Sequence, residues 1–392
     1  MSAADRGYVA LLTRPGALPL FLWVNLARLV YGALPLALLL LVAGRRGSYA
    51  DAGVTLAVFS IPGFLGPARA RLVDRLGARR VLVALALGLF LAVTGLDLLA
   101  GGPLVVVFGL ALLAGCTPPP VGPLMRAAWR ELSGGDPDVL RRAYSLDSVG
   151  EDVLFVLGPL VAAAAASTSG ASTLVPALAA VLVVAALGIG SCRPGRMPPS
   201  APAHAAPALL RDPHFLVGLS PVAGLGLLLG GVGIASVAAA LAVAGTSLAG
   251  VPAAAVSTGS VVGGLLYGSR GLPGSPRAQA RWLVCVASGL VALTALGSSV
   301  FALLVGGLAL AGLCIAPALV CSYLVADAAA PVGSTEATAW VNAAFNVSVG
   351  LGTAVAGGLV DATSPEGGML VAAAAAVGMV LLPRLVRRAA AV

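Results

Sequence analysis

A charged stretch of fifteen residues, 66–80, decides the fold, and it reads GPARARLVDRLGARR. It holds five arginines and a single carboxylate, Asp74. Long apolar runs flank it, residues 50–65 before it and residues 81–100 after it. Each run is long enough to enter a membrane, whereas a stretch this charged cannot cross the hydrocarbon core. We therefore expect residues 66–80 to form a hairpin at a membrane face.

The composition is that of an integral membrane protein. Apolar residues make up 59% of the 392 residues, charged residues make up 10%, and the mean hydropathy is +1.03. Too few polar side chains are present to cover a soluble globule. At roughly 30 residues for each helix and its connection, a chain of this length holds about a dozen membrane spans. We expect no additional soluble domain, and we expect residues 1–16 to lead into a first membrane helix and not a cleaved signal peptide.

Twelve apolar runs, bounded by charged residues or by glycine and proline, are predicted to be membrane helices. In chain order they are Leu18–Val42, Asp51–Pro67, Val81–Ala100, Leu104–Met125, Ala143–Ala166, Thr173–Ser191, Phe215–Ala240, Ser247–Tyr267, Trp282–Ser298, Phe301–Val325, Thr335–Val360 and Gly368–Leu385. A polar segment rich in proline and alanine, residues 192–213, is predicted to be a cytoplasmic linker. The sequence thus predicts an all-α membrane protein with two six-helix bundles, residues 1–191 and 214–392.

All 23 basic residues are arginine, and their distribution indicates the orientation. With the N-terminus inside, Arg45 and Arg46 fall outside, Arg28 falls within a span, and the other 20 fall on cytoplasmic segments. This bias follows the positive-inside rule, places both termini in the cytoplasm and makes a nucleic-acid partner unnecessary. Four of the five cysteines lie in apolar runs, and the two histidines, His204 and His214, lie in or beside the linker. No disulfide framework, metal site or cofactor is therefore expected.

The charged stretch also carries a family resemblance. Its residues match the pattern Gly-x-x-x-Asp-Arg-x-Gly-x-Arg-Arg, found between helices 2 and 3 of major facilitator superfamily (MFS) transporters, at Asp74, Arg75, Gly77, Arg79 and Arg80. The first glycine of the pattern is replaced by Ala70. The resemblance implies the twelve-helix MFS fold and a gating role for the five residues, with Asp74 locking the two halves through charge-assisted hydrogen bonds and a helix-end dipole. The alternative is an ordinary basic loop that obeys the orientation rule.

An internal repeat supports two related halves. The pattern Gly-Leu-Ala-Leu, Cys, Pro at residues 109–119 recurs 198 positions later, at residues 307–317. Repeats of this kind are typical of transporters in which two helical bundles rock about a site at the membrane midplane. Coincidence in a chain rich in alanine, leucine and glycine is the alternative.

Polar residues inside the predicted spans are the candidate transport residues, because each costs a few kcal/mol at the bilayer centre unless it faces a partner or water. They are Asn25 and Arg28 in the first span, Asp147, Glu151 and Asp152 in the fifth, and Asn342 and Asn346 in the eleventh. Arg28 lies roughly at mid-bilayer and needs an anion, so we expect it to pair with Glu151 or Asp152, either structurally or in linkage to substrate or protons. Both asparagines of the eleventh span are predicted to face the bundle interior, as substrate contacts or as hydrogen-bonding glue between helices.

Gly158 and Pro159 predict a close helix contact and a bend in the fifth span. They resemble part of the Gly-Pro signature of MFS antiporters, although Ala162 and Ala163 replace two glycines of that signature. The family's antiporter arginine in the middle of helix 4 is also absent from Ala111–Pro120. The case for export is weakened by both departures.

These features favour a secondary transporter, and not an enzyme, in a bacterial cytoplasmic membrane. We expect a monomer that couples protons to the export of a small amphipathic metabolite or antibiotic by alternating access. Proton-coupled uptake of a small polar solute is the alternative, because carboxylates in the fifth span can exchange protons in either direction. A lipid flippase or a membrane-embedded enzyme is a rival from another class, but no predicted span contains a histidine. The sequence has no phosphate-binding Gly-x-x-x-x-Gly-Lys-Ser/Thr loop, so we do not expect ATP to drive the process.

Overall fold

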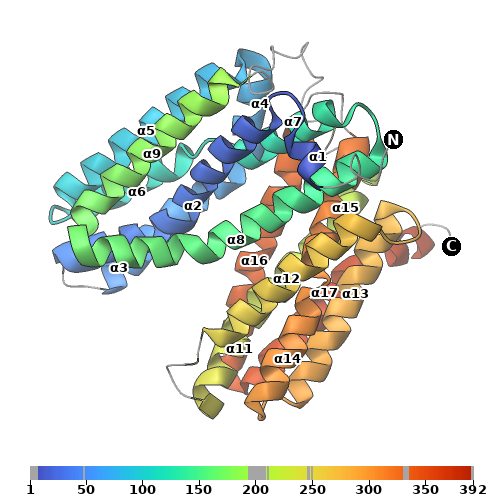
Figure 1. Ribbon diagram of the computed structural model, residues 1–392. Coiled ribbons are helices and arrows are strands. Elements are labelled where there is room, and N and C mark those ends of the chain that lie inside the picture. The colour runs from blue at the N-terminus through green and yellow to red at the C-terminus, as the bar shows by residue number, and fades with distance from the viewer. Residues whose placement is uncertain are drawn as a thin grey trace. The chain divides into compact units, whose positions relative to one another are not determined.

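The computed structural model describes residues 8–46, 49–192, 209, 212–244, 248, 250–329 and 335–389, and this part of the chain is helical without a strand. The helices, shown in Figure 1, are α1 (Tyr8–Leu12), α2 (Ala17–Arg46), α3 (Tyr49–Ser60), the 3-10 helix η2 (Ile61–Leu65), α4 (Gly66–Leu76), α5 (Ala78–Leu99), α6 (Leu104–Cys116), α7 (Val121–Ser133), α8 (Pro137–Ser169), α9 (Ala171–Ser191), α11 (Pro213–Ala244), α12 (Val251–Arg270), α13 (Pro276–Leu296), α14 (Phe301–Gly312), α15 (Ile315–Ala328), α16 (Glu336–Ala362) and α17 (Pro365–Ala389). The prediction of an all-α fold is confirmed.

Ten helical segments in the described ranges are long and apolar enough to cross a membrane. They match the predicted spans except the second and the twelfth. The second is divided into α3 and η2, because Pro62 and Gly63 interrupt the regular helix. The twelfth corresponds to α17, whose apolar part, Pro365–Leu381, is shorter than the other spans. The twelve-helix count and the cytoplasmic termini stay predictions.

The chain forms two compact units. Unit 1 comprises Met1–Asp136, Val153–Ala203 and Val332–Ala339, and unit 2 comprises Pro137–Asp152, His204–Pro331 and Trp340–Val392. Helices α8 and α16 therefore each contribute residues to both units. The predicted division at residues 191 and 214 does not include these two exchanged segments, and most of the predicted linker lies outside the described residues.

In unit 1, α2 packs against α9 and α3, while α5 packs against α9 and α6, as Figure 1 shows. Glycines permit the closest approaches. A Cβ on Gly158 of α8 would lie 2.5 Å from the carbonyl carbon of Gly32 in α2, and a Cβ on Gly115 of α6 would lie 2.1 Å from the carbonyl oxygen of Phe59 in α3. The close helix contact predicted at Gly158 is therefore present. A side chain at Gly158 or at Gly115 would force the two helix backbones apart. The bend predicted at Pro159 stays a prediction.

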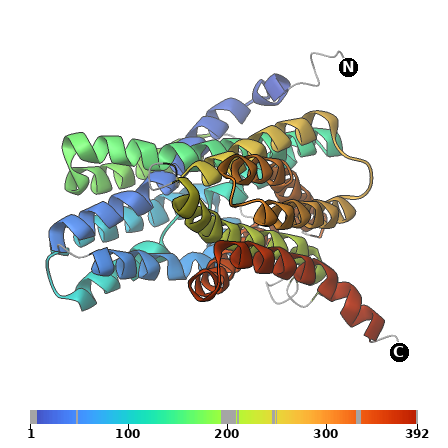
Figure 2. The ribbon, with the colours of Figure 1, turned by 90° about the horizontal axis from the view of Figure 1, so that it is seen from below.

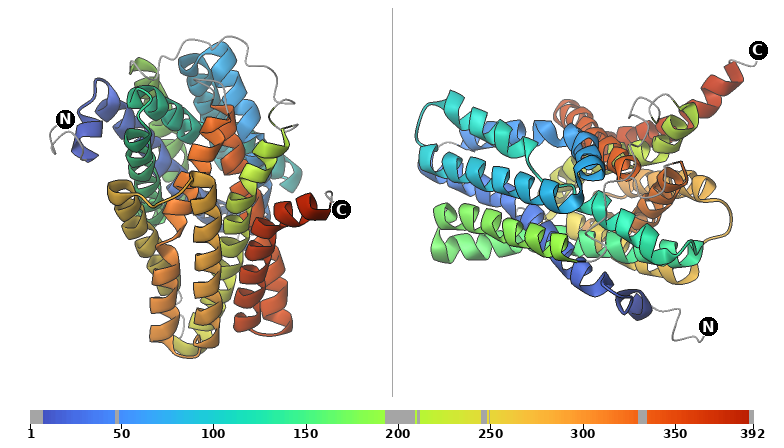
Figure 3. Two further views of the ribbon diagram at one scale, coloured as in Figure 1. Left: turned by 90° about the vertical axis from the view of Figure 1, so that its right-hand side faces the viewer. Right: turned by 90° about the horizontal axis from the view of Figure 1, so that it is seen from above.

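In unit 2, α11 packs along α17, α13 packs against α15 and α17, and α12 packs against α14 and α15. Figure 2 shows α11 beside α17, and Figure 3 shows the last turns of α17 projecting from the helices that it packs against. Close backbone contacts recur here. A Cβ on Gly259 of α12 would lie 2.1 Å from the carbonyl oxygen of Ala309 in α14, and one on Gly230 of α11 would lie 2.0 Å from that of Val349 in α16.

The internal repeat marks an interruption in both the fourth and the tenth spans. Helix α6 ends at Cys116 and α7 begins at Val121, while α14 ends at Gly312 and α15 begins at Ile315, directly after Cys314. Both spans continue beyond their interruptions, to Ser133 and to Ala328. The helical segment of the fourth candidate span therefore continues past Met125, the residue at which we predicted the span to end. The proline run that follows Cys116 breaks the helix, but α7 continues the span after it.

Candidate functional site

The charged stretch 66–80 is helical on both sides of a single glycine. Helix α4 ends at Leu76 and α5 begins at Ala78, while Gly77 between them has φ +86° and ψ 140°. This backbone conformation is essentially confined to glycine, and the Gly77 N–H caps α4 by donating to the Val73 carbonyl at 2.9 Å. The other matched residues of the stretch, apart from Asp74, have exposed side chains: Arg75, Arg79 and Arg80.

Asp74 is buried and binds the residue before α16. The Thr335 backbone N–H donates to both carboxylate oxygens of Asp74, at 3.2 and 3.1 Å. The Thr335 hydroxyl lies 2.9 Å from Asp74 Oδ1 and 3.1 Å from the Ala70 carbonyl oxygen, so its one hydrogen is shared between them. A carboxylate at the start of a helix also meets the positive end of the helix dipole. All three residues belong to unit 1.

The charge balance around Asp74 sets its protonation. Burial raises the pKa of Asp74 to about 6, against the lowering effect of the Thr335 hydrogen bonds. The nearby Glu336 carboxylate raises this pKa further, and the Arg130 guanidinium lowers it. Glu336 is itself buried and lies 3.8 Å from Arg71 Nε. The pKa of Asp74 is therefore about 6, well above that of an exposed aspartate.

The break between α6 and α7 is closed by side chains from two other helices. Three consecutive prolines, residues 118–120, have no N–H to donate to the carbonyls of the preceding turn. Arg69 of α4 donates to the Gly115 carbonyl at 3.2 Å, and the Tyr31 hydroxyl of α2 donates to the Pro119 carbonyl at 2.6 Å. The break is thus tied to α4, the helix that carries Asp74.

Two buried arginines lie in the spans of unit 1. Arg28 of α2 is 2% exposed, and Arg126 of α7 is 1% exposed. Asn25, one turn before Arg28, donates its amide to the Phe21 carbonyl at 2.9 Å. Arg28 belongs to unit 1 and Glu151 and Asp152 belong to unit 2, so the pair expected between them stays a prediction.

The carboxylates of α8 differ in their surroundings. Asp147 is fully buried, whereas Glu151 and Asp152 are half-buried. Asp152 accepts a 2.6 Å hydrogen bond from the Ser260 hydroxyl of α12. Helix α12 comes close because Gly264, one turn along from Ser260, has no side chain. Asp152 is thus an acceptor at a contact between two membrane helices of unit 2.

A second polar cluster of unit 2 joins α8, α15 and α16. The Tyr144 hydroxyl of α8 donates to the buried Asp327 carboxylate of α15. The Tyr144 ring meets the Tyr323 ring edge-on, with centroids 6.3 Å apart, and the Tyr323 hydroxyl donates to Asn342 Oδ1 at 2.6 Å. Asn342 is therefore part of this cluster. Asn346, one turn later, has an exposed side chain, and its predicted interior role stays a prediction.

Sequence reasoning missed three residues of these clusters: Arg126, Tyr144 and Asp327. Arg126 and Asp327 were each placed beyond the end of a span, although no glycine or proline follows either within the next three residues. The absence of a helix-breaking residue after each position was the signal that the helix continues. Tyr144 carries no charge, and its partner lies 183 residues away, so no local pattern identifies it. Within the described ranges, no group of three or more His, Cys, Asp or Glu residues could hold a metal ion.

No protein-family model and no curated protein sequence matches the chain. Solved structures do match. The human organic anion transporter MFSD10 (TETRAN) aligns with a TM-score of 0.72 at 17% identity, covering 94% of this chain and 97% of that chain. A bacterial homologue of the iron transporter ferroportin, in an outward-facing state with soaked iron, aligns with a TM-score of 0.69 at 14% identity, covering 94% and 97%. The E. coli fucose:proton symporter FucP (N162A) aligns with a TM-score of 0.66 at 15% identity, covering 95% and 99%. Together with the ten apolar helices of the described residues, this similarity shows that the chain is a multi-pass membrane protein with the major facilitator fold.

Proposed function

We propose that the protein is a proton-coupled secondary transporter that exports a small amphipathic compound from a bacterial cytoplasm by alternating access. The major facilitator fold supports the transporter class, since the three similar structures named above are of a transporter, a symporter and a homologue of a transporter. The proton coupling is supported by carboxylates inside apolar helices.

The observation that carries this proposal is the Asp152–Ser260 hydrogen bond. A carboxylate within an apolar span is costly unless it is functional or paired. Asp152 has a hydroxyl as its neighbour on α12, and a hydroxyl can bond either the charged or the protonated carboxyl group. Asp152 is therefore suited to bind a proton in one step of a transport cycle and to release it in another. Asp147 and Glu151 provide further acidic groups on the same helix.

The contact between Asp74 and Thr335 supports a gate at α4. Helix α16 continues from Ala339 into unit 2, whereas its first residues belong to unit 1. In this proposal the hydrogen bonds at Asp74 hold the first residues of α16 to α4, and they break when the head of α16 moves. Arg75, Arg79 and Arg80 are exposed at the same corner, where they would interact with the membrane surface. In this proposal Asp74 controls the rate of the conformational change and not the affinity for substrate.

The test uses proteoliposomes with an imposed pH gradient and a panel of labelled amphipathic compounds. Asp152→Asn should reduce gradient-driven transport at least ten-fold, and the double variant with Glu151→Gln should remove the pH dependence. Asp138→Asn is the matched control, because Asp138 lies on the same helix but its side chain is 66% exposed and bonds Arg141. Equal transport by the Asp152 and Asp138 variants would exclude Asp152 as the proton site.

Proton-coupled uptake is the second candidate. The same carboxylates would serve it, and the fucose:proton symporter shares the fold at 15% identity. Reversing the pH gradient in the same proteoliposomes separates the two directions. Export predicts accumulation in vesicles that are acidic inside when the cytoplasmic face points outward, and uptake predicts accumulation with the opposite gradient.

A further inference from the structure

Unit 2 has a cavity at the corner between α12 and α13. Its volume is about 410 Å³, and it is lined by Leu272, Pro273, Ala278, Gln279 and Trp282. The corner joins two of the candidate membrane spans, Val251–Arg270 and Pro276–Leu296. The cavity therefore lies at a level where membrane helices end.

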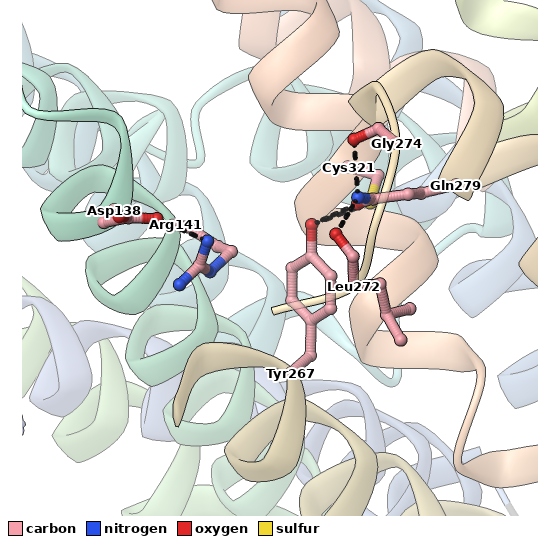
Figure 4. A network of polar contacts seen from close by, with 7 residues as sticks. All are labelled: Asp138, Arg141, Tyr267, Leu272, Gly274, Gln279 and Cys321. Carbon is pink, nitrogen blue, oxygen red and sulfur yellow. Dashed lines mark hydrogen bonds and ion pairs between the residues drawn. The ribbon is translucent and has the colours of Figure 1, made fainter. Parts of the chain in front are cut away.

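The cavity wall is held in place by hydrogen bonds. Figure 4 shows the network that holds it, centred on the Gln279 side chain. The Gln279 amide donates to the carbonyls of Leu272 and Gly274, at 2.6 and 2.9 Å, and its Oε1 accepts from the Tyr267 hydroxyl at 2.7 Å. The Cys321 thiol also reaches Oε1, at 3.3 Å. These bonds occupy the donors and the acceptor of Gln279, so this polar side chain places little polar demand on an occupant.

Three arginines are neighbours of the lining residues along the chain. Arg270 ends α12, and Arg277 and Arg281 lie one turn apart on α13. The lining residues Ala278 and Trp282 each follow one of these two arginines, so the charged face and the lining face of α13 are adjacent. Arg270 and Arg277 are exposed, and Arg281 is half-buried.

Helices α12 and α13 and the loop between them contain no acidic residue, and Asp138 of α8, which Figure 4 shows beside this corner, is bonded to Arg141 at 2.6 Å. No aspartate or glutamate occurs between Asp212 and Asp327. Trp282 is 57% exposed, and tryptophan is enriched where membrane helices meet the headgroup region. Basic clusters at the cytoplasmic ends of membrane helices attract anionic lipid headgroups, and the positive-inside rule assigns this corner to the cytoplasmic side.

From these observations we infer that the corner binds an anionic phospholipid, with an acyl chain in the cavity and the phosphate at Arg277 and Arg281. The apolar wall matches the chain, and the arginines match the headgroup by charge. This inference requires only that the protein lies in a membrane. It does not depend on proton coupling or on the direction of transport.

Native mass spectrometry of the full-length, delipidated protein tests the inference, with phosphatidylglycerol and phosphatidylcholine of identical acyl chains as probes. Phosphatidylglycerol should bind at least ten-fold more tightly. The double variant Arg277→Gln, Arg281→Gln should weaken its binding roughly 25-fold, since each arginine near a headgroup contributes about five-fold. The control variant, Arg45→Gln, removes an exposed arginine that the positive-inside rule assigns to the opposite membrane face, and it should change binding less than three-fold.

A second variant tests the cavity itself. Ala278 has an exposed side chain that lines the cavity, so Ala278→Trp should fill the space without disturbing the buried core, and phosphatidylglycerol binding should fall at least ten-fold. Equal binding of the two lipids would overturn the inference, and so would unchanged binding by Ala278→Trp. Inorganic phosphate that displaces the lipid at millimolar concentration would show that the corner recognises a free anion and not a lipid.

Discussion

Two connections between helices, the α4–α5 corner and the α12–α13 corner, share the same kind of capping glycine but differ in the contacts of their polar side chains. Both follow a helix whose last turn is capped by a glycine with positive φ, Gly77 at +86° and Gly271 at +68°, and both glycine N–H groups donate to the carbonyl four residues earlier. The first corner contains a buried carboxylate, Asp74, and the second contains none. Asp74 binds the head of α16, whereas Gln279 of the second corner folds its own loop back on itself. The first corner thus uses a carboxylate to bind the head of another helix, whereas the polar side chain of the second corner is hydrogen-bonded to its own loop, to Tyr267 and to Cys321.

Removing Asp74 should have the largest effect. Asp74→Ala leaves the buried Thr335 N–H without its acceptor, which costs roughly 1–3 kcal/mol, and transport should slow at least ten-fold. Asp74→Asn keeps one acceptor oxygen and removes the charge, so it should slow transport less. Substrate binding should be nearly unchanged in both variants, because Asp74 lies in α4 outside the candidate spans.

Transport rates and binding affinities measured on the same purified variants check this prediction. Hydrogen exchange at residues 335–339 is an independent readout, since these amides should exchange faster in Asp74→Ala. Lost binding by a correctly folded variant would argue against a gating role.

The pH dependence of stability should follow Asp74. Its pKa is raised to about 6 in the folded protein, so between about pH 4 and pH 6 the folded state holds a proton that the unfolded state has released. Stability should therefore fall as pH rises through this window, by at most about 3 kcal/mol, and level off above it. Melting temperatures from pH 4 to pH 8 measure the effect, and Asp74→Asn should flatten the curve. A curve of unchanged slope in Asp74→Asn would assign the dependence to another group.

The two glycines should be comparably hard to replace. Their backbone conformations are disfavoured for a residue with a Cβ, which costs about 1–3 kcal/mol in Gly77→Ala and in Gly271→Ala. Gly77 has open space around it, whereas a Cβ on Gly271 would lie 2.9 Å from the Arg141 guanidinium carbon. We therefore expect only a slightly larger loss of unfolding free energy in Gly271→Ala, because the guanidinium is the movable end of a flexible side chain. The further variant Arg141→Ala should make the two losses equal.

The sequence predicted the features that depend on local chemistry. Apolar runs located ten of the candidate spans, and the glycine in the charged stretch located the first corner. The expected role of Asp74 in locking the two halves stays a prediction. The sequence did not predict the partners, because Thr335 lies 261 residues from Asp74 and Asp327 lies 183 residues from Tyr144. Such pairs depend on tertiary packing, which periodicity does not encode.

The predicted end of the fourth span differs from the end of the helix for another reason. Its prolines do interrupt the helix, but Arg69 and Tyr31 of other helices donate hydrogen bonds to carbonyls at the interruption. The proline run therefore predicted the local break correctly, but the helix continues beyond the predicted end of the span, and Arg126 lies in that continuation.

The smallest expected effect comes from adding the missing charge to the second corner. Ser269 has an exposed side chain in the last turn of α12, where its hydroxyl bonds the Leu266 carbonyl at 2.9 Å. Ser269→Asp should change the unfolding free energy by no more than about 0.5 kcal/mol, because substitutions at exposed sites rarely do more. It should nevertheless weaken phosphatidylglycerol binding about five-fold, since one carboxylate offsets one of the arginines that attract the headgroup. Ser269→Asn is the control of equal size, and its lipid affinity should match that of the unaltered protein. If Ser269→Asp bound the anionic lipid as tightly as Ser269→Asn, the absence of acidic residues from this corner would have no bearing on lipid binding, and the contrast between the two corners would rest on Asp74 alone.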